Sequence, residues 1–381
     1  MTITYVVETL YTRGGTERIL SEKANYLSDR YGYNVHIISC TQKQDQPNAF
    51  PLSPSVKQTC LGIPLYSQYR YRYPKRLFVK LSLNKILRKS VTDLIQKINP
   101  DILIGIGHFK ADMISTIDCH AKKITECHES RVFTLLENRV NKTLLSSIYL
   151  YFFRNKYFQI IEKNTDVVIT LTNDDKKEWQ KAKCTEVIPN FSTMSVSDYC
   201  NNKHKRIIAV GRLEWEKGYE RLIDIWEKSS IQHPDWSLDI FGDGTQRNNL
   251  QEIINNRKIR RIQIHHATND ISKEYANSSI CVLTSYYEGF ALVLLEALKH
   301  GVPCIAFDCP YGPASIIRNN QCGFLIENGN IPQFAEKLNL LIEKKSLRNE
   351  FSQKAIERAK AFDIDIIMEK WKDLFERLCA T

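Results

Sequence analysis

Two glutamates in the stretch SYYEGFALVLLEALKHG, residues 285–301, are spaced so that both could bind one ligand. Glu288 follows the apolar run 281–284, which is typical of a buried strand, and Glu296 lies in a run whose leucines have helical spacing. Eight helical residues separate two side chains by roughly 10–12 Å, more than the roughly 5–9.5 Å between the carboxylates of a glycosidase. The pair therefore suits the two ends of an elongated ligand better than glycoside hydrolysis.

The helix in this stretch is expected to begin near Phe290 and to end before Gly301 and Pro303. Its first backbone N–H groups, which have no partners within the helix, favour an anion between the two glutamates. A ligand with polyhydroxyl ends and a phosphate middle is a nucleotide sugar. The alternative interpretation is a surface glutamate before a buried helix and a second glutamate on its solvated flank.

A second group of charged side chains lies at another strand-to-helix turn. The strand RIIAV, residues 206–210, is followed by Gly211, Arg212, Lys217 and Gly218. The two cations point to a place where a helix N-terminus already favours anions, so they could hold a phosphate.

The first strand of the chain is also followed by a glycine turn. TITYVVE, residues 2–8, alternates as a strand does, and a helix is expected from about Thr16 to Arg30. Gly14 and Gly15 between them allow a ligand to approach the backbone closely. Such a unit is typical of nucleotide-binding α/β folds, in which ligands lie at the carboxyl ends of the strands.

These motifs resemble those of one enzyme family. The stretch with Glu288 and Glu296 resembles the E-x7-E element of the GT-B retaining glycosyltransferases of family 4 (glycosyltransferase group 1), of the bacterial polysaccharide and lipid-linked glycan type. The string GRLEWEKG at 211–218 resembles the family element whose Arg and Lys hold the donor diphosphate. KKITECHES at 122–130 resembles the strand that ends in an acceptor-side histidine, here His128.

The resemblance implies an α/β fold of the GT-B class, with two Rossmann-like doubly wound domains facing across a cleft. The length of 381 residues independently favours two domains. We expect an N-terminal acceptor-side domain at 1–190, with a C-terminal helix at 363–381 packing back on it, and a C-terminal donor-binding domain at 191–362. The polar stretch 192–206 is expected to be the linker.

The resemblance also implies a hexosyltransferase. It would move a hexose or N-acetylhexosamine from a nucleotide sugar, expected to be a UDP-sugar, to a glycan or lipid-linked acceptor in bacterial surface polysaccharide synthesis, with retention of configuration. His128 and Glu288 are the implied catalytic residues. Glu288 would bind the donor sugar, Glu296 the ribose diol, and His128 would orient donor and acceptor. The residues implied for donor binding are Gly14, Gly15, Arg212, Lys217, Glu288, Gly289, Phe290, Ala291 and Glu296.

No metal or other cofactor is expected. Arg212, Lys217 and the helix dipoles could neutralise a diphosphate without a divalent ion, and the resemblance implies metal independence. A DxD signature is missing from the strand ends, since Asp363 and Asp365 lie near the last helix. The 11 cysteines show no zinc-binding spacing, and their scatter favours reduced thiols in the cytoplasm.

The net positive charge is confined to the first half of the chain. Residues 1–193 hold 28 Lys and Arg against 18 Asp and Glu, whereas residues 194–381 hold 25 of each. The segment 64–97, here called the basic aromatic segment, has nine basic side chains against one acid, interleaved with aromatic residues. This composition suits an anionic membrane surface, single-stranded nucleic acid or a merely solvated face.

The absence of a signal sequence and of an apolar run of 18 residues favours a protein that is neither secreted nor membrane-spanning. The apolar aromatic helix expected at 143–161 is too short an apolar run to span and is interpreted as core or interfacial. We expect a cytoplasmic enzyme, peripheral at the inner face of the cell membrane, with no nucleic-acid partner.

Three other functions fit parts of the sequence. A GT-B sugar-nucleotide epimerase or hydrolase would bind the same donor and act without an acceptor. A non-enzymatic nucleic-acid-binding protein would explain the basic aromatic segment but would leave Glu288, Glu296 and Lys217 without a role. A dinucleotide oxidoreductase would need GxGxxG after the first strand, where the chain has only Gly14 and Gly15.

Overall fold

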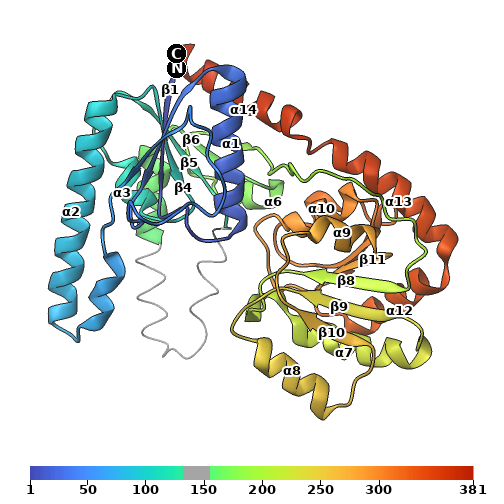
Figure 1. Cartoon of the computed structure of the whole chain (residues 1–381). Coiled ribbons are helices and arrows are strands. Elements are labelled where there is room, and N and C mark those ends of the chain that lie inside the picture. The colour runs from blue at the N-terminus through green and yellow to red at the C-terminus, as the bar shows by residue number, and fades with distance from the viewer. Residues whose placement is uncertain (130, 132–154, 381) are drawn as a thin grey trace. The chain divides into compact units, whose positions relative to one another are not determined.

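The computed structural model describes residues 1–129, 131 and 155–380 (Figure 1). The chain divides into two compact units, which are described separately: unit 1 is Met1–Ile188 with Ile367–Thr381, and unit 2 is Pro189–Ile366. Most of the helix expected at 143–161 lies outside the described residues. Among the helices that are described, none has the length and apolar character of a membrane span.

Unit 1 is built on a parallel sheet of seven strands in the order β3-β2-β1-β4-β5-β6-β7. Strands β4 and β6 are buried along their whole length, as expected for β-branched runs that helices cover on both faces. The order reverses between β1 and β4, which is where ligands bind in doubly wound folds. The strands are β1 (Thr2–Val7), β2 (Asn34–Ser39), β3 (Lys57–Cys60), β4 (Ile102–Ile106), β5 (Lys122–Glu126), β6 (Val167–Thr170) and β7 (Thr185–Val187).

The last helix of the chain belongs largely to unit 1. The ammonium of Lys23 in α1 lies 4.0 Å from the ring centroid of Trp371 in α14, and Arg377 Nη2 lies 2.9 Å from Oε2 of Glu186 in β7. The helices of this unit are α1 (Gly15–Tyr31), η1 (Leu65–Arg70), α2 (Lys75–Ile98), α3 (Ala111–Ser115), α6 (Asn173–Lys176) and α14 (Ile364–Ala380), and residues 155–164 are also helical.

Unit 2 repeats the architecture with six parallel strands in the order β10-β9-β8-β11-β12-β13, so its order reverses between β8 and β11. The strands are β8 (Arg206–Val210), β9 (Ser237–Phe241), β10 (Ile262–His265), β11 (Ile280–Leu283), β12 (Cys304–Asp308) and β13 (Gly323–Glu327).

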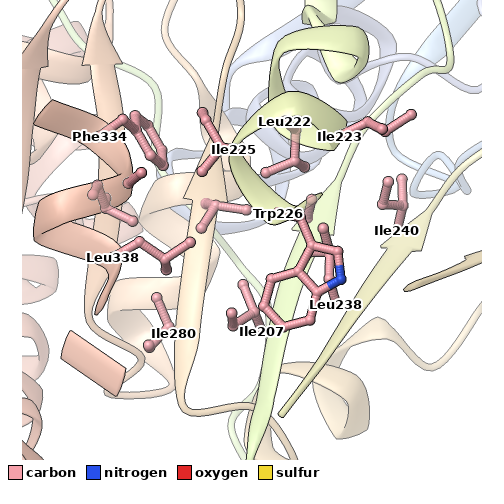
Figure 2. Packing of buried hydrophobic residues seen from close by; sticks show 14 of the residues in the cluster. Ile207, Leu222, Ile223, Ile225, Trp226, Leu238, Ile240, Ile280, Phe334 and Leu338 are labelled. Atoms are coloured by element: carbon pink, nitrogen blue, oxygen red, sulfur yellow. The ribbon is translucent and has the colours of Figure 1, made fainter. Parts of the chain in front are cut away.

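The core of unit 2 lies between its sheet and helices α7 and α12. Figure 2 shows Trp226 of α7 above Ile207 and Leu238 of the sheet, with Phe334 and Leu338 of α12 beside them. The buried indole of Trp226 donates a hydrogen bond to the carbonyl of Arg260 at 3.1 Å, which satisfies its one polar atom. The helices are η2 (Trp215–Lys217), α7 (Tyr219–Gln232), α8 (Arg247–Asn256), α9 (Ile271–Ala276), α10 (Leu292–Lys299), α11 (Pro313–Ile316), α12 (Ile331–Glu343) and α13 (Lys345–Lys360).

Helix α10 begins at Leu292, two residues later than the sequence predicts. Ala291 has φ 60° and ψ 55°, a left-handed conformation in which a right-handed helix cannot continue. Glu288 therefore lies outside the helix, and the separation of 10–12 Å expected between Glu288 and Glu296 does not apply, because it assumed eight helical residues.

Candidate active site

The loops that follow β8 and β11 touch each other at the switch point of unit 2. Gly218, which precedes α7, has φ 63°, and a Cβ added to it would lie 2.2 Å from the carbonyl oxygen of Thr284. The hydroxyl of Thr284 donates a hydrogen bond to the carbonyl of Gly218 at 3.0 Å. The sequence thus needs glycine at 218 both for the backbone angle and for this contact.

Lys217 and Glu288 meet across these two loops. Lys217 Nζ donates to Glu288 Oε1 at 2.8 Å, and the hydroxyl of Ser285 donates to the same oxygen at 2.6 Å. Both charged side chains are largely buried, with 18% of Lys217 and 7% of Glu288 exposed. The structure therefore brings two of the predicted site residues into one ion pair, to which it adds Ser285.

Arg212 lies at the surface of the same loop. Its Nη2 donates to Glu216 Oε1 at 2.9 Å, and 71% of its side chain is exposed. Arg212 is thus available to an anion from solution, whereas Lys217 is held inside the loop contact.

Sequence reasoning missed Arg221 and the aromatic residues beside it. The guanidinium of Arg221, on α7, lies 3.9 Å from the ring centroid of Tyr286 and donates to the carbonyl of Thr284. Tyr286 in turn stacks on the exposed ring of Trp215, with centroids 4.9 Å apart and planes 11° apart. Aromatic residues in both loops, SYYEG and EWEKG, were the available signal.

The backbone next to Glu288 adopts unfavourable conformations. Ala291 and Tyr311 have φ near 60°, and Gly312 has φ 106°. A Cβ added to Gly312 would lie 3.2 Å from Cβ of Glu288. For the non-glycine residues Ala291 and Tyr311, such conformations cost about 1–3 kcal/mol each, and they often occur at functional sites.

The side chains of Phe290 and Ala291 are buried, at 3% and 5% exposure, and Phe290 packs edge-on against Phe362. A ligand at the N-terminus of α10 would accordingly meet the backbone of Gly289, Phe290 and Ala291.

Glu296 is buried within unit 2. The hydroxyl of Tyr275 donates to Glu296 Oε2 at 3.3 Å, and only 7% of Glu296 is exposed. The alternative in which Glu296 lies on a solvated flank is therefore wrong. Burial raises the pKa of Tyr275 well above its ordinary value, and the charge of Glu296 raises it further. Beyond Glu296, His300 bonds through Nδ1 to the carbonyl of Glu296 at 2.8 Å.

Unit 1 contains a pocket of about 790 Å³ at the carboxyl ends of β1 and β4. Glu8, Glu17 and His128 contribute to its lining, as do Tyr66 and Arg70 of η1. The position is the one predicted for a ligand, because the strand order of this sheet reverses there.

Gly14 and Gly15 lie at the start of α1, beside this pocket. Gly14 is the N-cap, with φ −127°, and Gly15 is the first helical residue. The pocket is lined at this point by their neighbours Thr12 and Thr16.

Of the described side chains, no group of three or more His, Cys, Asp or Glu is arranged to hold a metal ion.

His128 follows β5 and is almost fully buried at the wall of the pocket. Its Nε2 lies 3.0 Å from Oε1 of Glu126, two residues earlier. Sequence reasoning identified His128 and missed Glu126, although residues two apart at a strand end project to the same side.

The sequence is similar to those of known glycosyltransferases. Residues 197–358, which lie within unit 2, match the family described as glycosyl transferases group 1. The chain is 29% identical to an uncharacterized glycosyltransferase of Haemophilus influenzae, over 98% of this chain and 99% of that protein. It is 34% identical to the amylovoran biosynthesis glycosyltransferase AmsD of Erwinia amylovora, over 54% of this chain and 61% of that protein.

Solved structures share the fold of the whole chain. A sucrose-phosphate synthase from Thermosynechococcus elongatus matches 100% of this chain and 99% of its own, with a TM-score of 0.79 and 18% identity. TarM of S. aureus, in complex with Fondaparinux, alpha-GlcNAc-glycerol and UDP, matches 98% of this chain and 99% of its own, with a TM-score of 0.75 and 17% identity. These matches confirm the predicted fold class.

Proposed function

We propose, because residues 197–358 match the family of glycosyl transferases group 1 and the chain has the GT-B fold, that this glycosyltransferase transfers a hexose or N-acetylhexosamine from a UDP-sugar to a glycan or lipid-linked acceptor. The transfer retains the anomeric configuration and serves bacterial surface polysaccharide synthesis. The observation that carries the proposal is the buried pair of Lys217 and Glu288 at the switch point of unit 2. The UDP in the TarM structure supports the choice of base.

In this proposal the loops that follow β8 and β11 bind different parts of the donor. An ammonium group has three N–H donors. The hydrogen bond to Glu288 occupies one of them, so the others can reach diphosphate oxygens. Exposed Arg212 adds a second cation, and the N-terminus of α10 adds backbone N–H groups. Glu288 accepts hydrogen bonds from the sugar hydroxyls, and Glu296 from the ribose diol.

The reaction requires no divalent metal in this proposal. Lys217 and Arg212 place two positive charges where the leaving diphosphate develops negative charge. They would stabilise that charge as a divalent metal ion does in other enzymes. The leaving phosphate accepts the proton of the acceptor hydroxyl, and His128 orients the reacting groups.

The pocket of unit 1 is the proposed acceptor site. Its carboxylates, threonine hydroxyls and histidines are suited to the hydroxyl groups of a saccharide, and Tyr66 offers an aromatic face. Arg70 lies at the same pocket and belongs to η1, which is the first part of the basic aromatic segment. The acceptor pocket and that segment are therefore continuous along the chain.

The basic aromatic segment is the proposed contact with an anionic membrane at the cytoplasmic face. Along η1, the connection that follows it and the first turns of α2 (Figure 1), Tyr69, Tyr73, Phe78 and Leu81 are exposed. Cations lie among them, and the guanidinium of Arg76 is 4.3 Å from the ring centroid of Tyr69. Exposed aliphatic side chains beside cations suit lipid better than nucleic acid, which would use the cations and aromatic rings alone.

The donor proposal is tested by a thermal-shift screen of nucleotide sugars followed by transfer assays. A bound donor stabilises the protein by mass action, so a UDP-sugar should raise the melting temperature and GDP- and ADP-sugars should not. Lys217→Met should lower kcat by about 10²–10³-fold, as does the loss of one group that stabilises developing charge. Lys228→Met, which changes an exposed lysine of the same unit, is the matched control.

Three results would overturn the proposal: stabilisation by a GDP- or ADP-sugar alone, wild-type turnover in Lys217→Met, or loss of activity in EDTA that magnesium or manganese restores. The acceptor is omitted in a parallel assay. Rapid isomerisation or hydrolysis of the donor there would favour the epimerase or hydrolase alternative.

A further inference from the structure

Three ionisable side chains form a buried chain of contacts behind the pocket of unit 1. Glu126, the last residue of β5, uses one carboxylate oxygen for each neighbour: Oε2 accepts from Lys23 Nζ, and Oε1 lies 3.0 Å from His128 Nε2. Less than 5% of each of the three side chains is exposed. His128 is the member of the chain that lines the pocket.

The surroundings hold Lys23 in place from the opposite side. It projects from α1 toward the sheet, where its ammonium lies 4.0 Å from the ring centroid of Trp371 and 5.3 Å from that of Tyr5. The faces of these aromatic rings attract the ammonium group, but they do not accept a conventional hydrogen bond from it. Glu126 is therefore the hydrogen-bonding partner that the ammonium has in the buried cluster, and burying either charge without the other would be costly.

The charge of Glu126 determines which nitrogen of His128 carries a proton. Burial alone would raise the pKa of Glu126, but the charge of Lys23 and the hydrogen bonds with Lys23 and His128 outweigh it and lower the pKa to about 2. Glu126 is thus a carboxylate and can only accept a hydrogen bond. The Nε2 atom of His128 must then be the donor, and Nδ1 is the nitrogen left for another partner.

We propose that Lys23 and Glu126 are positioning residues: they fix the imidazole of His128 with Nε2–H on Glu126, so that Nδ1 meets a hydroxyl group of the acceptor sugar in the pocket of unit 1. This inference rests on the proposed function for the identity of the ligand. The geometry of the three side chains stands without it. Among the described residues, Nδ1 has no hydrogen-bonding partner within the protein.

The direct test is nitrogen NMR of the full chain labelled with ¹⁵N-histidine, with the His128 signal assigned from its loss in His128→Asn. The wild type should show neutral His128 as the tautomer with the proton on Nε2. In the double variant Lys23→Met with Glu126→Gln, which removes both charges together and nearly preserves their volumes, this fixed tautomer should give way to a mixture. A wild-type signal with the proton on Nδ1 would overturn the inference, whether or not any variant folds.

The kinetic test separates positioning from a structural role. The double variant should lose about 10- to 100-fold in kcat, the range that losing a hydrogen bond to a charged group produces, while the KM for the donor changes less than twofold. The control removes an exposed ion pair of the same unit, through Lys177→Met with Asp174→Asn, and should leave both constants unchanged. Unchanged kcat in a folded double variant would also overturn the inference.

The two proposals fail in different ways. If no nucleotide sugar is turned over, the proposed function is wrong, but the tautomer of His128 still decides whether Lys23 and Glu126 position it. If the tautomer is the wrong one while transfer proceeds, the positioning inference alone is wrong.

Discussion

Two glycines of unit 2 separate the effect of backbone angle from that of close contact. Gly218 and Gly329 both have positive φ, at 63° and 89°, but only Gly218 has an atom, the Thr284 carbonyl oxygen, within 3 Å of an added Cβ. We expect Gly329→Ala to lower the free energy of unfolding by about 1 kcal/mol. Gly218→Ala should cost about 1–3 kcal/mol more. Urea denaturation measures both, and equal costs would contradict the close contact of the two loops.

Asp175 should make stability fall as pH rises. Burial raises the pKa of this carboxyl to about 7, against which the hydrogen bond from the Arg131 backbone N–H acts. Its unfolded pKa is about 3.9. Between about pH 4 and 7 the folded state therefore binds more protons than the unfolded state, and the contribution of Asp175 to stability is lost over that range.

Asp175→Asn should accordingly stabilise the protein by about 1–2 kcal/mol at pH 8 and far less at pH 4.5. The amide oxygen can still accept the hydrogen bond from Arg131. Urea denaturation at the two pH values measures the change, with the exposed neighbour Asp174→Asn as control. A variant equally stable or less stable at pH 8 would contradict the raised pKa.

At the residue scale, the sequence predicted the members of the site better than their contacts. Lys217 and Glu288 were both predicted, but 71 positions separate them and only the packed loops show that they pair. Lys23 was missed because a lysine in an amphipathic helix is expected in solvent. Its burial depends on Glu126, which lies 103 positions away.

Among the elements, α14 offers a sharp test of how a distant segment stabilises unit 1. Trp371 is buried and lies over the ammonium of Lys23. Trp371→Ala should lower the free energy of unfolding by about 3–5 kcal/mol, from the cavity and the lost aromatic face. Ile366→Ala, at an exposed position of the same helix, should change it by less than about 0.5 kcal/mol. Similar effects of the two substitutions would show that α14 does not pack as described.

Elements with long periodic patterns were predictable, and short polar ones were not. The strands at β1, β2, β4 and β6 follow from apolar runs, whereas β3 (KQTC) and β7 (TEV) are strands only because they pair with a neighbour in the sheet. The start of α10 was predicted too early because Leu294, Leu295 and Leu298 mark the helix face but not the left-handed residue before it.

For the whole molecule, the uneven charge predicts salt-sensitive binding to anionic liposomes. Each Lys or Arg near an anionic bilayer contributes about 1 kcal/mol, so four or five suffice for reversible binding. Changing Arg70, Arg72, Lys75 and Arg76 to Glu should abolish sedimentation with anionic liposomes at low salt. The same change at four exposed lysines of unit 2, Lys344, Lys345, Lys354 and Lys360, should not. Equal loss in both variants would indicate a response to net charge alone, and no binding by the wild type would favour a soluble acceptor.

Because the chain returns to unit 1 through α14, a packing contact as well as the linker connects the segment after unit 2 to unit 1. A protease that cuts between residues 192 and 205 would leave one fragment with most of unit 1 and another with unit 2 and α14. The buried Trp371 and Phe375 and the contact with Lys23 would then have to be broken before the fragments could part. The two fragments of the nicked protein should consequently elute together in native buffer and separate only in denaturant. The same two fragments, expressed separately and mixed, should associate through this helix.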